Sequence, residues 1–212
     1  MKKTKVKICG VKETSTIDCC VKNNVDYFGL VFYSNSPRNI NLEVALKLIS
    51  YVKSKKITPV GVFVNQPINE LKDIIKKTHL NYIQLHGNED SDYINLLKNE
   101  FELKIIKSIG IKEKNDFIKM EKLSNTDYFL FDYKPQINEL PGGNAKKFNW
   151  LLLQNIKINK PWFISGGINV NNIQQILDNL IPYGIDISSG VEEKLGIKSS
   201  HKINKLLEIL NA

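Results

Sequence analysis

Eight short apolar runs recur along the chain with longer amphipathic segments between them, and this alternation is the feature that most constrains the fold. The runs are rich in β-branched and aromatic residues and have the length of strands. The intervening segments repeat apolar residues at helical spacing, as Leu42, Ala45, Leu46 and Ile49 do. The predicted strands are Lys5–Cys9, Tyr27–Phe32, Pro59–Val64, Tyr82–His86, Leu103–Ile109, Asp127–Tyr133, Trp162–Gly166 and Gly184–Ser189.

Eight strands that alternate with eight helices predict parallel βαβ units. The 212 residues give each unit 212/8, or between 26 and 27 residues. That is near the minimum for a closed barrel of eight units, a fold that typically takes about 250 residues. The rival is a doubly wound open sheet, which usually has fewer units and a Gly-rich first turn, whereas only Gly10 stands there. Because no linker divides the chain, we predict one α/β domain over residues 1–212, a (β/α)8 TIM barrel.

The composition argues against several classes of protein. The chain is 42% hydrophobic and 25% charged, as soluble globular proteins are. Its apolar runs are far shorter than the roughly 20 residues of a membrane span, and no continuous apolar region follows the basic N-terminus, so neither a membrane segment nor a signal peptide is expected. Three cysteines, of which Cys19 and Cys20 are adjacent, make neither a disulfide framework nor a spaced metal site. We therefore expect a cytoplasmic protein.

The net charge of +8, from 30 basic and 22 acidic residues, fits either nucleic acid or an anionic small substrate. The lysines are scattered over predicted helix faces, and no basic stripe carries interleaved aromatic residues. We therefore expect no nucleic-acid partner and treat most lysines as solvated, although an anionic substrate would benefit from the charge.

Strand alternation places polar side chains inside the barrel near the carboxyl ends of four strands. In the first strand Val6 and Ile8 face the helices, so that Lys7 and Cys9 point inward. Barrel enzymes hold their active sites at this end. The other inward polar residues predicted in this way are Gln84, His86, Asp132, Asp186 and Ser188.

Cys9 and Asp132 are the candidates for proton transfer. Lys7 lies two residues before Cys9 on the same face, and its ammonium would lower the pKa of the thiol, which suits a base or nucleophile. Asp132 stands between Phe131 and Tyr133, where partial desolvation would raise the pKa of its carboxyl and suit a general acid. A small core cysteine and a helix-capping or salt-bridged aspartate are the alternatives. A base and an acid on opposed strands indicate an isomerisation.

Two turns and one arginine indicate an anionic substrate. Ser165-Gly166-Gly167 and Ser188-Ser189-Gly190 follow the last two predicted strands, where barrel enzymes bind phosphate on backbone N–H groups. Arg38 is the single arginine of the chain, and its guanidinium suits a bidentate carboxylate, although a solvated surface arginine is the alternative. No second histidine lies on the rim near His86, so we expect no metal site.

Together these motifs resemble the phosphoribosylanthranilate isomerase family from the first strand to the last, in order and at the right spacing. The resemblance implies a (β/α)8 barrel that works in tryptophan biosynthesis. It implies a cofactor-free Amadori rearrangement of N-(5-phosphoribosyl)anthranilate to 1-(2-carboxyphenylamino)-1-deoxyribulose 5-phosphate. The matching motifs are Lys7-Ile8-Cys9-Gly10, Gly29-Leu30-Val31-Phe32 with Ser36-Pro37-Arg38, Gly61-Val62-Phe63-Val64-Asn65, Gln84-Leu85-His86-Gly87, Asp132 with Pro141-Gly142-Gly143, Ser165-Gly166-Gly167 and Asp186-Ile187-Ser188-Ser189-Gly190-Val191-Glu192.

The resemblance also assigns roles to single residues. It makes Cys9 the general base, Asp132 the general acid and Arg38 the partner of the anthranilate carboxylate. The expected partner is a phosphorylated small molecule, and the chain is expected to be a monomer or a homodimer. The remaining implied substrate contacts are Lys7, Gln84, His86, Gly143 and Asp186, and the implied phosphate contacts are Gly166, Gly167, Ser188, Ser189 and Gly190.

Three segments depart from the family's pattern. Asn144-Ala145 stands where Thr-Gly is usual, which could alter how the loop closes over the substrate, and Asn149 stands where Asp is usual. Ile197-Lys198-Ser199 replaces a usual Lys-Asp. Two other functions remain as alternatives, a phosphosugar epimerase and a non-catalytic barrel that binds a phosphorylated ligand. The first would favour paired aspartates and metal-binding histidines, and the second would not need Cys9 or Asp132.

Overall fold

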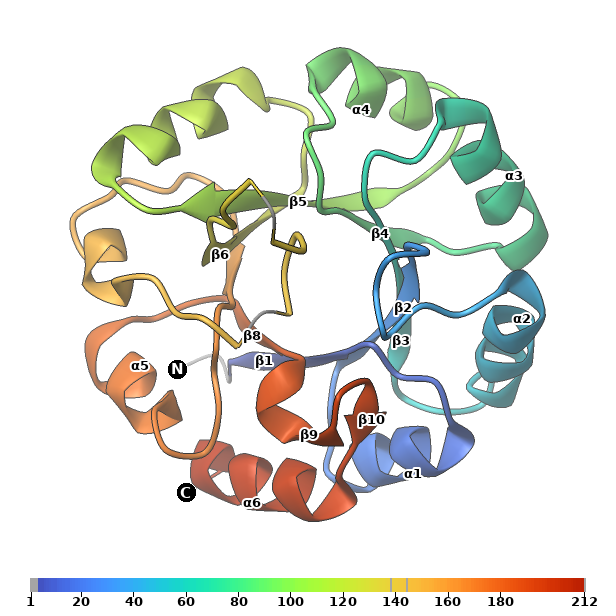
Figure 1. Cartoon of the computed structure of the whole chain (residues 1–212). Coiled ribbons are helices and arrows are strands. Elements are labelled where there is room, and N and C mark those ends of the chain that lie inside the picture. The colour runs from blue at the N-terminus through green and yellow to red at the C-terminus, as the bar shows by residue number, and fades with distance from the viewer. Residues whose placement is uncertain (1–3, 138, 144, 212) are drawn as a thin grey trace.

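The eight predicted strands form one closed parallel barrel in chain order, which confirms the predicted fold class (Figure 1). The computed structural model describes residues 4–137, 139–143 and 145–211. Each strand pairs with the next, and β8 pairs with β1 through Lys7 and Asp186. The strands are β1 (Lys5–Cys9), β2 (Tyr27–Phe32), β3 (Thr58–Phe63), β4 (Tyr82–Leu85), β5 (Lys104–Ile111), β6 (Tyr128–Tyr133), β7 (Trp162–Ile164) and β8 (Gly184–Ile187).

A helical segment follows every strand, but two of the eight are 3₁₀ helices rather than α-helices. These are η1 (Lys114–Lys122), after β5, and η2 (Trp150–Leu153), after β6. In η1 only Asp116 and Phe117 are buried, so it lacks the continuous apolar stripe that holds an α-helix against the barrel. The α-helices are α1 (Thr14–Lys22), α2 (Leu42–Tyr51), α3 (Ile68–Thr78), α4 (Ser91–Lys98), α5 (Ile173–Asn179) and α6 (Ser200–Asn211).

The strands alternate between two cores, as their sequence pattern predicts. Ile8, Phe28 and Ile83 face outward and belong to the large core between the barrel and its helices. The inward residues Tyr27, Val60, Ile106, Leu130 and Phe163 fill the lower part of the barrel as a separate apolar cluster. The barrel interior is therefore packed from below, and the polar inward residues lie above this cluster.

Several strands end earlier than predicted because the chain turns sharply at the rim. The ends of β4, β7 and β8 leave His86, Ser165 and Ser188 in the connecting loops. The glycines after β7 drive one of these turns, since Gly166 has φ of 89° and Gly167 has φ of 66°. The seventh helix consequently starts at Ile173 and not directly after the diglycine.

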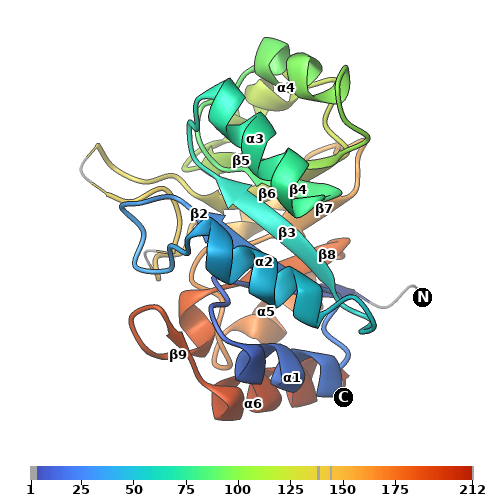
Figure 2. The same ribbon diagram turned by 90° about the vertical axis from the view of Figure 1, so that its right-hand side faces the viewer.

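A short hairpin after β8 is absent from the predicted elements. It consists of η3 (Ser189–Val191), β9 (Glu192–Lys194) and β10 (Ile197–Lys198), whose charged residues give no strand-like alternation. Figure 2 shows this hairpin rising on the same side of the barrel as the loops after β2 and β6. Within the described ranges, no helix is both long and apolar enough to cross a membrane.

Candidate active site

The carboxyl ends of the strands surround one pocket that most of the predicted site residues share. Cys9, Arg38, Gln84, His86, Asp132, Gly143, Asp186 and Ser188 line it. A second, adjoining pocket is lined by Gly166, Gly167, Ser188 and Ser189, together with Asp132, Gly143 and Asp186. Lys7 lines neither pocket, since its side chain is completely buried and its ammonium contacts Asp186 on the neighbouring strand. Gly190 packs so closely on Ile168 that an added Cβ would lie 1.8 Å from the Ile168 carbonyl oxygen.

Cys9 is the last residue of β1, and its side chain enters the pocket beside β2. Gly29 is its partner across the strand pair, and a Cβ added to Gly29 would lie 2.7 Å from Cys9 Sγ. The glycine therefore provides the space that the sulfur occupies. The backbone around the thiol is also held from β8, because Ser188 Oγ donates a hydrogen bond of 3.0 Å to the Cys9 carbonyl.

The predicted lowering of the Cys9 pKa by Lys7 is wrong in its net direction. Burial raises the pKa of the thiol above its ordinary value, and this effect outweighs the attraction of Lys7. Lys7 Nζ also lies 2.9 Å from Asp186 Oδ1, so its charge reaches the sulfur together with an opposing carboxylate. The strand pattern placed Lys7, Cys9 and Asp186 inside the barrel, but it could not show that Asp186 pairs with Lys7 or how deeply the sulfur is buried.

Asp132 stands near the end of β6 with one oxygen on the backbone and the other facing His86. Its Oδ1 accepts a hydrogen bond of 2.7 Å from the Tyr133 N–H. Its Oδ2 lies 3.4 Å from His86 Nε2, which is also 3.4 Å from Ser108 Oγ. The neighbouring carboxylate and imidazole form a pair between which a proton can move.

Gln84 fixes the other side of the His86 ring. Its Nε2 lies 2.7 Å from His86 Nδ1, while its buried Oε1 has no hydrogen-bond partner in the described part of the chain. With the amide in this orientation Gln84 donates to Nδ1, so the ring carries its proton on Nε2, toward Asp132. The inward side of β4 therefore orients the imidazole against the carboxylate.

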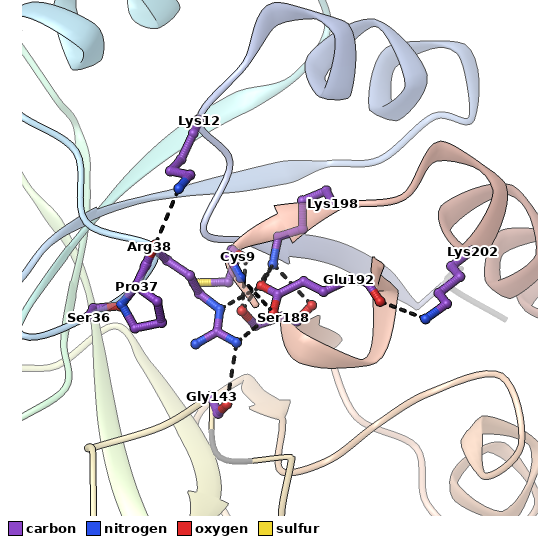
Figure 3. Close-up of polar contacts among 11 residues, drawn as sticks. Cys9, Lys12, Ser36, Pro37, Arg38, Gly143, Ser188, Glu192, Lys198 and Lys202 are labelled. Atoms are coloured by element: carbon purple, nitrogen blue, oxygen red, sulfur yellow. Dashed lines mark hydrogen bonds and ion pairs between the residues drawn. The ribbon is translucent and has the colours of Figure 1, made fainter. Parts of the chain in front are cut away.

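Arg38 enters the pocket from the loop after β2, but its bidentate face is already occupied. Nε and Nη2 donate hydrogen bonds of 2.7 and 2.8 Å to the two oxygens of Glu192 (Figure 3). Nη2 also donates to the Gly143 carbonyl at 3.3 Å. Among the described residues Nη1 has no acceptor, so it is the group that this arginine offers to a ligand. The two parallel hydrogen bonds that we predicted for a carboxylate ligand are made to Glu192 instead.

Two residues of the hairpin contact pocket-lining residues, although neither is among the residues predicted for the site. Glu192 and Lys198 are buried beside Arg38, and their side chains are 2.7 Å apart. Glu192 lies in a motif that matches the family, and Lys198 lies in a segment that departs from it. Neither residue is on a predicted strand, so the alternation of side chains could not predict that they face inward. Of the departing residues, Asn149 caps η2 by accepting from Leu151 N–H, while Asn144 lies outside the described residues.

The two turns predicted to bind phosphate lie at the ends of β7 and β8. The turn after β7 and the turn after β8 face the adjoining pocket together, and η3 begins directly at Ser189. Backbone N–H groups of such turns suit an anion. In the described part of the chain, no cluster of three or more His, Cys, Asp or Glu side chains is arranged to hold a metal ion.

Comparison with known proteins gives matches over nearly the whole chain. The family model described as N-(5'phosphoribosyl)anthranilate (PRA) isomerase matches residues 6–209. An N-(5'-phosphoribosyl)anthranilate isomerase of Thermoanaerobacter pseudethanolicus is 39% identical over 204 residues, which are 96% of each chain. The crystal structure of phosphoribosyl anthranilate isomerase from Thermotoga maritima matches with a TM-score of 0.88 and 28% identity over 98% of each chain.

A further solved structure bears on the ligand. It is a phosphoribosyl anthranilate isomerase in complex with reduced 1-(o-carboxyphenylamino)-1-deoxyribulose 5-phosphate. It matches with a TM-score of 0.79 and 25% identity, and the match covers 98% of both chains.

Proposed function

The chain belongs to the N-(5'-phosphoribosyl)anthranilate isomerase family, and on that premise we propose that it converts N-(5-phosphoribosyl)anthranilate to 1-(2-carboxyphenylamino)-1-deoxyribulose 5-phosphate in tryptophan biosynthesis. The observation that carries this proposal is the meeting of Cys9 and Asp132 in one pocket, from the non-neighbouring strands β1 and β6. An aldose-to-ketose rearrangement needs one group that donates a proton and one that removes a proton.

In the proposed mechanism Asp132 protonates the furanose ring oxygen, which opens the sugar to a Schiff base. The Cys9 thiolate then removes the C2′ proton, and the resulting enolamine tautomerises to the aminoketose. His86 lies next to Asp132, with 3.4 Å between Nε2 and Oδ2, so that a proton can pass from the imidazole to the carboxylate and restore the acid. Each positioned proton transfer contributes typically about 10²–10⁴-fold to the rate.

The two ends of the substrate would be held by opposite sides of the pocket. We place the phosphate in the turns after β7 and β8, where Gly166, Gly167, Ser188 and Ser189 line the adjoining pocket. We place the anthranilate carboxylate at Arg38 Nη1, which no described residue engages. Binding both remote anions supplies energy that positions the sugar between acid and base.

The floor of the pocket has a supporting role in this proposal. Asp186 lines the pocket and would accept a hydrogen bond from a sugar hydroxyl, while Lys7 on the neighbouring strand holds its carboxylate at 2.9 Å. Lys7 therefore acts through Asp186, and the direct contact with substrate that the sequence suggested for it is replaced by an indirect one.

Complementation tests the function directly. A strain that lacks the isomerase should grow on medium without tryptophan when it expresses this chain. It should not grow when it expresses Asp132→Asn, because an amide cannot deliver a proton. Absence of growth with the folded wild-type chain would reject the proposed function. A purified Asp132→Asn enzyme that loses only substrate affinity would instead make Asp132 a binding residue.

A further inference from the structure

Glu192 is the centre of a buried cluster that joins the hairpin to the pocket. Its Oε1 accepts from Arg38 Nε and from Lys198 Nζ, both at 2.7 Å. Its Oε2 accepts from Arg38 Nη2 at 2.8 Å and from the Gly196 N–H at 3.2 Å. We call Arg38, Glu192 and Lys198 the Glu192 cluster. The side chains of all three are at most 5% exposed, so water screens their charges little.

The charges of the Glu192 cluster do not cancel. Two cations share one carboxylate, which leaves one positive charge without a partner in the cluster. The other buried pair near the thiol, Lys7 with Asp186, is neutral. A cation that lacks its own counter-ion stabilises an anion placed beside it, whereas a neutral ion pair acts only as a dipole.

Lys198 also connects the Glu192 cluster to the backbone of the predicted base. Its Nζ donates to the Ser188 carbonyl at 3.0 Å and to Ser188 Oγ at 3.2 Å, and Ser188 Oγ in turn donates to the Cys9 carbonyl. Figure 3 shows Lys198 extending from β10 to the turn beside Cys9. Burial lowers the pKa of Lys198, but its three acceptors, among them the Glu192 carboxylate, match the three protons of an ammonium group and oppose that effect.

We propose that Lys198 is a positioning residue that supplies the unpaired positive charge beside the Cys9 thiolate and braces the Ser188 turn against β1. The proposal rests on the proposed function only for the role of Cys9 as base. The charged groups that act on Cys9 are Lys7 and Asp186 on the barrel strands and Lys198 on the hairpin, and Arg38, His86 and Asp132 line the same pocket. Lys198 lowers the pKa of the thiol against the larger opposing effect of burial.

The decisive experiment compares Lys198→Met with the wild type by the rate of Cys9 alkylation as a function of pH. Iodoacetamide reacts with the thiolate, and peptide mapping separates Cys9 from Cys19 and Cys20. We expect the midpoint for Cys9 to rise by about one pH unit in Lys198→Met, because loss of a nearby positive charge removes an effect that lowers the pKa of the thiol. We also expect kcat to fall at least tenfold, with a smaller change in KM.

Two further variants separate charge from position. Lys198→Arg keeps the charge and should restore most of the alkylation midpoint. Ser188→Ala removes the bond to the Cys9 carbonyl and should lower kcat without moving the midpoint. Lys202→Met is the matched control, since among the described residues Lys202 Nζ bonds only the Glu192 backbone carbonyl, at 2.6 Å, and this variant should keep kcat within twofold.

Each possible result supports or overturns the proposed role of Lys198, even where a variant is inactive. An unchanged Cys9 midpoint in folded Lys198→Met would overturn the role of its charge. A kcat within twofold of the wild type would overturn its role in catalysis. If Lys198→Met does not fold, Lys198→Arg takes its place, and a Cys9 midpoint that rises by a full pH unit although the positive charge is kept would reject the proposal. Alkylation needs no substrate, so a chain that fails complementation but shows the midpoint shift would leave this inference standing while the proposed function falls.

Discussion

Gly29 faces Cys9 across the β1–β2 pair and leaves no room for a methyl group, which would lie 2.7 Å from the sulfur and 3.0 Å from the Cys9 Cα. The second contact is with the backbone, so rotation of the thiol alone would not relieve the clash. The position of the predicted base is therefore set by a residue that has no chemistry of its own.

Gly29→Ala should consequently lower kcat by at least tenfold through displacement of the thiol. Overpacking of this kind costs typically about 1–3 kcal/mol of stability. Gly61→Ala is the control, since its added methyl would lie 2.8 Å from Phe63 in the outer core, away from the thiol. Steady-state rates and denaturant unfolding of both variants check this. Equal losses of kcat in the two variants would mean that general destabilisation, not the thiol, explains the effect.

Cys9→Ser should fold normally and lose about 10²–10⁴ in kcat, because a serine hydroxyl is a far weaker base than a thiolate. In the wild type, kcat/KM should still be rising with pH at the ordinary thiol value of 9.0, since burial holds the pKa of Cys9 above it. A pH–rate profile of both enzymes measures this. Cys20→Ser, in the outer core on α1, should cost stability and leave kcat alone. Near-normal turnover of Cys9→Ser would remove Cys9 from the mechanism.

Arg38→Ala should weaken transition-state binding by about 2–5 kcal/mol, the range for truncating one partner of a buried charge pair. The loss should shrink for a substrate analogue that lacks the carboxylate, and kcat/KM for both enzymes on both substrates forms a double-mutant cycle. Arg38→Lys should recover only part, because an ammonium cannot hold both oxygens of Glu192 and still offer a donor to the ligand. An equal loss on both substrates would show that Arg38 acts only through Glu192 and the fold.

Glu192 should make the fold sensitive to acid. Burial alone would raise the pKa of Glu192, but hydrogen bonds and charge from Arg38 and Lys198 outweigh it and lower the pKa from 4.5 to about 2. Because the folded value lies below the unfolded one, the stabilisation is complete above pH 4.5 and is lost as the pH falls toward about 2. It amounts to about 3 kcal/mol.

Unfolding free energies of the wild type and Glu192→Gln from pH 7 to pH 2 isolate this contribution. The variant should be less stable at pH 7, because two cations remain without a carboxylate, and the gap should narrow as the pH falls. A gap that stays constant over this range would contradict the assigned pKa.

The alternation of eight strands with eight helical segments predicted the barrel, and the period-two pattern of the strands predicted the inward direction of Lys7, Cys9 and Asp132. It relies on local regularity, and β1 alternates cleanly between the outer core and the interior. The same reasoning could not find Lys198 or Glu192, because they belong to a short charged hairpin with no apolar pattern. Glu192 meets Arg38 across 154 positions of sequence, and only closure of the barrel brings them together.

The pKa of Cys9 shows a second limit of sequence reasoning. Spacing placed a cation beside the thiol, but the direction of the shift depends on how deeply the sulfur is buried and on Asp186, which comes from the other end of the chain. Both quantities are properties of the closed barrel and not of any segment.

An apolar cluster fills the barrel beneath the pocket and closes the pocket at that end. It consists of Tyr27, Val60, Ile106, Leu130 and Phe163. Ligands therefore reach the pocket from the rim and not through the barrel, because the interior of such a barrel is a packed core and not a pore. Substrate cannot enter from one side while product leaves by the other. Product must leave before substrate can bind, so accumulated product competes with substrate for the same opening.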